Sequence, residues 1–152
     1  MKTATVRILV VDDFTPFRQW VRTKLETQQN FEIAGEAADA LEGIQKAQEL
    51  TPDLIVLDVA LPDINGIEAA KQLCRVVPSA KILFLSRHAD EDIAQYGLSN
   101  GAQGYVVKSD AERELFSAIE EVLRGGKFVG SGVKQMVKTP MPNRLLQFAT
   151  LT

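Results

Sequence analysis

The sequence has little of what would mark a secreted or a membrane protein. Cys74 is the only cysteine among 152 residues, which excludes an internal disulfide framework and fits a reducing compartment. No apolar run approaches the ~18 residues that a membrane span requires. Residues 1–7 also lack the apolar core of a signal peptide. We therefore expect a cytoplasmic protein that does not bind a membrane.

Negative charge is absent from the end of the chain. Residues 1–121 carry 12 Lys and Arg against 20 Asp and Glu, a net charge of −8, whereas residues 122–152 carry five basic residues and no acidic one. A domain that binds nucleic acid usually presents a basic face, so the acidic body is a poor candidate. We interpret the basic end as a solvated linker, and a nucleic-acid contact there is the alternative.

Short apolar runs alternate with helical periodicity along most of the chain. The strands are predicted at residues 6–12, 31–37, 53–58, 81–86 and 103–107, and the helices at 16–28, 41–50, 66–77, 90–100 and 112–124. Several strands are apolar throughout, which is typical of a sheet covered by helices on both faces. Strict alternation predicts an α/β fold, (βα) five times over, with a doubly wound parallel sheet of five strands.

Polar residues indicate where three of these helices begin. Thr15 is a candidate N-cap with a proline at the first helical position. Asp39 with Glu42, and Ser109 with Glu112, have the spacing of capping boxes. Past residue 124 the pattern fades among glycines and prolines. We expect one folded domain over residues 1–128, followed by a linker or partly disordered tail over 129–152 without an effector domain.

Chemically active side chains follow four of the predicted strands. The first strand ends in Asp12 and Asp13, the third in Asp58 and the fourth in Ser86, and the fifth is followed at once by Lys108. A parallel sheet places its functional site at the carboxyl ends of its strands. Any one of these residues alone means little, but together they predict one site.

The residue types at this site suit phosphoryl transfer to a carboxylate. Adjacent carboxylates repel each other, and a Mg²⁺ ion held by Asp12, Asp13 and Asp58 would offset that repulsion, since Mg²⁺ prefers oxygen ligands. Asp58 would be the nucleophile that forms an aspartyl phosphate. Lys108 and Ser86 would contact phosphoryl oxygens, and the ammonium would neutralise charge developing in the transition state.

Over about residues 5–130 the chain resembles the receiver domains of two-component response regulators. The resemblance rests on the acidic pair, "LIVLDVALPDINGIE", "ILFLS" and "GAQGYVVKS". The segments "GAQGYVVKSD" and "AIEEVLRGGKFV" most resemble the sequences of the branch whose receivers precede a LuxR-type helix-turn-helix domain. The resemblance implies a flavodoxin-like fold with strand order 2-1-3-4-5.

The resemblance also implies a function and partners. Asp58 would accept a phosphoryl group from a sensor histidine kinase or a phosphotransfer protein, and Ser86 and Tyr105 would form the switch. The protein would not be an enzyme in the ordinary sense, but a phosphoacceptor with self-catalysed transfer and weak autodephosphorylation. A homodimer is possible, and DNA would be contacted only through a missing or separate effector domain.

Some positions depart from the family pattern. Ser109 follows Lys108 where the family often has a cis proline, so a cis bond is not implied. Arg87 replaces a small residue, and with His88 it would modulate access to the phosphorylation pocket. Ala60 replaces a polar residue, although its backbone carbonyl could ligate Mg²⁺. Gly97, inside a predicted helix, either loosens that helix and eases the switch or relieves a tight packing contact.

Two other functions do not fit the sequence, and a third remains as an alternative. A haloacid-dehalogenase type phosphatase needs D-x-D on one strand, and a Rossmann dinucleotide binder needs G-x-G-x-x-G after the first strand; the sequence "DDFTPF" fits neither. The remaining alternative is a pseudo-receiver that binds a partner without being phosphorylated. The complete set of Asp, Ser and Lys residues counts against it, and Arg87 counts mildly for it.

Overall fold

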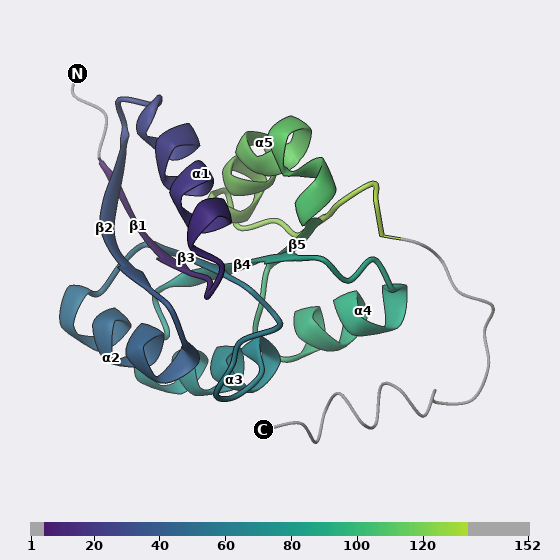
Figure 1. Ribbon diagram of the computed structural model, residues 1–152, viewed down its shortest axis with the longest axis horizontal. Coiled ribbons are helices and arrows are strands. Elements are labelled where there is room, and N and C mark those ends of the chain that lie inside the picture. Colours follow the sequence, from purple (N-terminus) through teal and green to yellow (C-terminus); the bar gives the residue numbers. More distant parts are fainter. Residues whose placement is uncertain (1–4, 134–152) are drawn as a thin grey trace.

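The computed structural model describes residues 5–133 (Figure 1). The described residues form a six-stranded parallel sheet with the order β2-β1-β3-β4-β5-β6. The strands are β1 (Val6–Val11), β2 (Phe31–Ala37), β3 (Leu54–Leu57), β4 (Lys81–Ser86), β5 (Gly104–Val107) and β6 (Phe128–Val129). The helices are α1 (Thr15–Glu26), α2 (Ala40–Leu50), α3 (Gly66–Val76), α4 (Glu91–Ser99) and α5 (Ala111–Leu123), and a 3₁₀ turn, η1, spans Lys108–Asp110.

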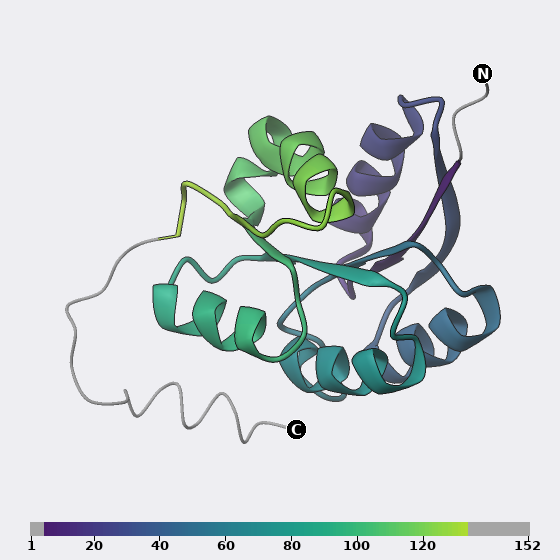
Figure 2. The same ribbon diagram turned by 180° about the vertical axis from the view of Figure 1, so that it is seen from behind.

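Helices cover both faces of the sheet. Figures 1 and 2 show α1 and α5 on one face and α2, α3 and α4 on the other. Strand β1 contributes Ile8 and Val10 to the core under α1 and α5, and Leu9 and Val11 to the core on the opposite face. This alternation explains the uniformly apolar strands, because each face of a doubly covered sheet is buried. Within residues 5–133, no helix has the length and apolar character to cross a membrane.

The predicted flavodoxin-like architecture is confirmed in class and strand order, and the structure adds a sixth strand. Strand β6 lies parallel to β5, with Gly104 opposite Phe128 and Tyr105 opposite Val129. The amide of Gly130 continues the pairing by donating to the Tyr105 carbonyl over 2.8 Å. This pairing extends past residue 128, where the folded domain is predicted to end, so the start of the predicted tail overlaps β6. The remainder of that predicted tail, 134–152, lies outside the described residues.

Side chains of α5 hold the segment after β6 in place. Glu114 Oε2 accepts hydrogen bonds from both the amide and the hydroxyl of Ser131. A Cβ at Gly130 would lie 2.7 Å from Glu114 Oε1, so a larger residue there would require the Glu114 side chain to shift. A two-residue strand among glycines has no periodicity, which is why the sequence pattern did not predict it.

One of the three predicted helix starts is confirmed. The Asp39 carboxylate accepts a hydrogen bond from the Glu42 amide over 2.8 Å, and the Glu42 carboxylate accepts one from the amide of Ala38. Both side chains thus satisfy backbone donors at the start of α2. The reciprocal bond reaches one residue further back than a standard capping box.

The other two predicted helix starts are wrong. Thr15 is already the first residue of α1, and Phe14 precedes it with no side-chain cap. Ser109 lies in the 3₁₀ turn, and α5 begins after Asp110 without a side-chain cap. No cis peptide bond occurs in the described part of the chain, so the bond from Lys108 to Ser109 is trans.

The structure favours the packing explanation for Gly97. This residue lies on the buried face of α4, against the ring of Phe84 on β4. A Cβ at position 97 would lie 2.8 Å from Cε2 and 3.2 Å from Cδ2 of that ring. A side chain at position 97 would require the Phe84 ring to shift, so close helix–sheet packing favours glycine here. The looser α4 stays a prediction.

Candidate functional site

The carboxyl ends of β1, β3 and β5 bring Asp12, Asp58 and Lys108 into contact. Lys108 Nζ lies 2.8 Å from Asp12 Oδ2 and 3.1 Å from Asp58 Oδ2. The three side chains are only 4%, 6% and 9% exposed, in the order Asp12, Asp58 and Lys108. Charges this far from water are stable only when they are paired. The ammonium of Lys108 therefore offsets part of the negative charge that the sequence places at the end of the first strand.

Asp13 completes a cluster of three carboxylates. Asp12, Asp13 and Asp58 each offer an oxygen, and these oxygens lie within 4.8 Å of one another. Asp13 is exposed, whereas the other two are buried. With Lys108 charged, the four ionised groups carry a net charge of −2. An all-oxygen donor set with this charge and one solvent-facing member fits a hydrated divalent cation such as Mg²⁺.

Backbone amides orient two of these carboxylates. Asp12 Oδ1 accepts a hydrogen bond from the Phe14 amide over 2.8 Å, and Asp58 Oδ1 accepts one from the Ala60 amide over 3.1 Å. In each case the aspartate side chain closes a turn by accepting a hydrogen bond from the backbone amide two residues later. The Oδ2 atoms, which contact Lys108, therefore face the centre of the site.

Burial changes the protonation equilibrium of Asp58. Loss of hydration raises the pKa of its carboxyl group from the ordinary value of 3.8 to about 6. The ammonium of Lys108 opposes this rise, and the negative charge of Asp12 adds to it. At neutral pH the carboxyl group is thus mainly ionised and nucleophilic, but it is more basic than an exposed aspartate.

Ser86 and Tyr105 are linked through the backbone of His88. The amide of His88 donates to Ser86 Oγ over 3.0 Å, and the hydroxyl of Tyr105 donates to the His88 carbonyl over 2.8 Å. Both side chains are fully buried, and burial raises the pKa of Tyr105 to about 12. The sequence predicts for His88 a role in access to the pocket, and the structure shows that its peptide groups make these two connections. Arg87, which lies between Ser86 and His88 in the sequence, is exposed.

Three further residues support the site, although the sequence pattern does not predict them as part of it. The ring centroid of Phe17 lies 4.6 Å from Lys108 Nζ. Arg18 donates to the backbone carbonyl of Asp12 over 2.6 Å. A Cβ at Gly66 would lie 2.1 Å from the Asp58 carbonyl oxygen. Only the glycine, inside the quoted "DINGIE", carried a local signal; the other two contacts depend on how α1 packs on the sheet.

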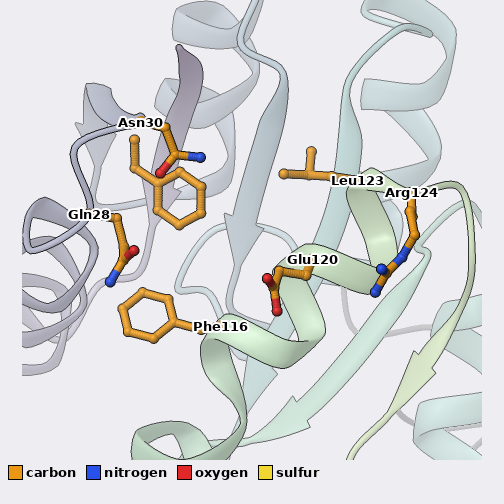
Figure 3. A pocket seen from close by; sticks show the side chains of 7 residues that line it. Gln28, Asn30, Phe116, Glu120, Leu123 and Arg124 are labelled. Carbon is orange, nitrogen blue, oxygen red and sulfur yellow. The ribbon is translucent and has the colours of Figure 1, made fainter. Parts of the chain in front are cut away.

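A pocket of about 490 Å³ lies away from these carboxylates (Figure 3). Figure 3 shows Phe116 and Glu120 of α5 facing Gln28 and Asn30 across it. Because β2 begins at Phe31 and α5 ends at Leu123, the pocket is at the amino ends of the strands. The candidate site is at the opposite edge, where the charged side chains converge.

Comparisons with known proteins agree with this geometry. A family model described as the response regulator receiver domain matches residues 8–120. The transcriptional regulatory protein LiaR of Bacillus subtilis is 36% identical over 120 residues, which are 79% of this chain and 57% of LiaR. DegU of Brevibacillus brevis is 32% identical over 124 residues, which are 82% of this chain and 52% of DegU. The chain thus spans little more than half the length of these two relatives.

A solved structure shows the same similarity in three dimensions. A LuxR-family two-component response regulator from Aurantimonas sp. SI85-9A1 superposes with a TM-score of 0.79 and 33% sequence identity, over 95% of this chain and 94% of that one. The matched residues 8–120 contain the acidic pair and the residues that end β3, β4 and β5. The chain therefore belongs to the response regulator receiver domain family.

Proposed function

We propose that this protein is a phosphorylation-dependent signalling switch that accepts a phosphoryl group on Asp58 in a Mg²⁺-dependent reaction. The observation that carries the proposal is the buried contact of Asp58 with Lys108, beside two further carboxylates. The phosphodonor is a phosphohistidine of a sensor histidine kinase or a phosphotransfer protein. Asp58 attacks phosphorus, and its new P–O bond forms as the P–N bond to the donor histidine breaks.

Each neighbouring residue has a role in this reaction. Lys108 neutralises charge on the phosphoryl oxygens, because its ammonium already lies beside the nucleophile. Asp12, Asp13, Asp58 and the backbone carbonyl of Ala60 hold Mg²⁺, which supplies further positive charge when bound. The protein catalyses its own phosphorylation and a weak dephosphorylation, and it has no other enzymatic activity.

The switch residues follow from the same arrangement. Ser86 ends β4 beside the site, and its hydroxyl moves to contact a phosphoryl oxygen. That movement changes its bond with the His88 amide, and the His88 carbonyl in turn accepts from Tyr105. Tyr105 thereby transmits the change to α4 and β5. Arg87 and His88, between β4 and α4, modulate access to Asp58.

The output and its setting are part of the same proposal. The phosphorylated protein acts in the cytoplasm through a partner protein or as a homodimer. The acidic body makes direct DNA binding by residues 5–133 unfavourable. We propose that any contact with DNA is made through an effector domain and not through residues 5–133, as the similarity to the transcriptional regulatory protein LiaR suggests.

Intact mass spectrometry after incubation with acetyl phosphate and Mg²⁺ tests the function. We expect the mass to increase by one acid-labile phosphoryl group, and we expect no increase with a chelator or in Asp58→Asn. A wild-type protein that remains unmodified while its fold is intact would refute the proposal. That result would support the alternative, a pseudo-receiver that binds its partner without phosphorylation.

A further inference from the structure

An aromatic ring completes the surroundings of the Lys108 ammonium. Phe17 lies in the first turn of α1, and the centroid of its ring is 4.6 Å from Lys108 Nζ. The ring stacks on Trp20 with a centroid distance of 5.6 Å and an interplanar angle of 27°. The Phe17 ring therefore packs against Trp20 of the same helix while it contacts the ammonium.

Within residues 5–133, the ammonium has three contacts, and they differ in how they respond to the proposed reaction. Two are with Asp12 Oδ2 and Asp58 Oδ2, and both carboxylates change during phosphorylation. Asp58 becomes an acyl phosphate, and Asp12 is a proposed Mg²⁺ ligand. The face of an aromatic ring attracts a cation without taking part in either change. The Phe17 contact is thus the one that the reaction leaves in place.

We infer that Phe17 is a positioning residue for phosphoryl transfer, whose ring holds the Lys108 ammonium beside Asp58. This inference rests on the proposed function, because it assigns the ring a part in that reaction. A poorly hydrated ammonium gains more from a ring than an exposed one does, and the Lys108 side chain is only 9% exposed. Without the ring, the flexible lysine side chain would sample more positions as its carboxylate partners change.

Substitution of Phe17 tests the inference through the rate of phosphorylation. Phe17→Leu keeps an apolar side chain but removes the ring, and we expect phosphorylation by acetyl phosphate at saturating Mg²⁺ to slow about three- to tenfold. Phe17→Tyr keeps the ring and should restore the rate to within about twofold of wild type. Equal rates for the leucine variant and the wild type would overturn the inference.

A matched control exists on the same face of the protein. Lys24 lies over the ring of Phe116, with Nζ 5.5 Å from the centroid, and this pair contacts none of the site residues discussed above. Phe116→Leu therefore removes a comparable contact and a comparable volume of half-buried side chain. We expect it to leave the rate within about twofold of wild type. A decrease equal to that of Phe17→Leu would show a general packing effect and would overturn the inference.

Two further measurements separate positioning from structural support. In a Lys108→Gln background, Phe17→Leu should cause no additional slowing, whereas a structural role would cause the same fractional loss in both backgrounds. NMR relaxation of the Lys108 Cε methylene should show greater mobility in Phe17→Leu than in wild type or Phe17→Tyr. If the wild type takes up no phosphate, the proposed function fails and the inference falls with it. If the wild type is phosphorylated but the methylene mobility in Phe17→Leu is unchanged, the inference alone is overturned.

Discussion

Replacement of Asp58 by asparagine should stabilise the protein at neutral pH in the absence of Mg²⁺. Burial raises the pKa of this carboxyl group from 3.8 to about 6, so the ionised form is disfavoured in the folded state. A difference of about two pKa units corresponds to about 3 kcal/mol. Asparagine has the shape of the protonated acid and no charge, so Asp58→Asn should recover most of that free energy at pH 7.

The contribution of Asp58 to the free energy of unfolding should depend on pH. The folded-state pKa lies above the unfolded-state value, so between pH 4 and 6 the folded protein binds more protons than the unfolded chain. The contribution of Asp58 to stability is therefore greatest below about pH 4, and it is lost as the pH rises through about 6. Asp58→Asn should remove this dependence, so the two proteins should converge at pH 4 and diverge at pH 7.

Thermal and urea unfolding in the presence of a chelator, from pH 4 to 7, measure this difference. For a protein of this size, about 3 kcal/mol corresponds to a Tm increase of roughly 6–12 °C. Glu112→Gln removes the same charge from an exposed position of α5 and should change Tm little. The reasoning would be refuted if the Asp58→Asn variant were no more stable than wild type at pH 7. It would also be refuted if the variant kept its greater free energy of unfolding at pH 4.

Three other substitutions have expected outcomes. Asp13→Ala should weaken Mg²⁺ binding by at least about tenfold, because it removes a carboxylate oxygen of the cluster; an unchanged stabilisation by Mg²⁺ in a thermal titration would contradict this role. Gly97→Ala should destabilise the protein by about 1–3 kcal/mol in urea unfolding, because its Cβ would overlap Phe84; a more stable variant would instead support a loosened α4. Gly66→Ala should slow phosphorylation of Asp58 even at temperatures well below the Tm of the variant, because the added Cβ would displace the Asp58 carbonyl. A wild-type rate in mass spectrometry would argue against that coupling.

The alternation of strands and helices along the chain predicts the class of the fold and most of the side chains that meet at the candidate site. Apolar strands alternating with amphipathic helices can satisfy both patterns only as a parallel sheet covered on two faces. In such a sheet, residues that directly follow the strands must meet at one edge. Asp12, Asp58 and Lys108 follow their strands without an intervening loop, so their convergence was predictable from their positions.

Contacts between side chains of different elements could not be predicted from local sequence patterns. Phe17 over Lys108 and Gly97 against Phe84 depend on how a helix is rotated and placed on the sheet, which helical periodicity fixes too coarsely. Strand β6 depends on the free edge of β5 and on Glu114 accepting from Ser131. Local patterns specify which residues are buried, whereas distances of a few ångströms between particular atoms depend on the packing of the whole chain.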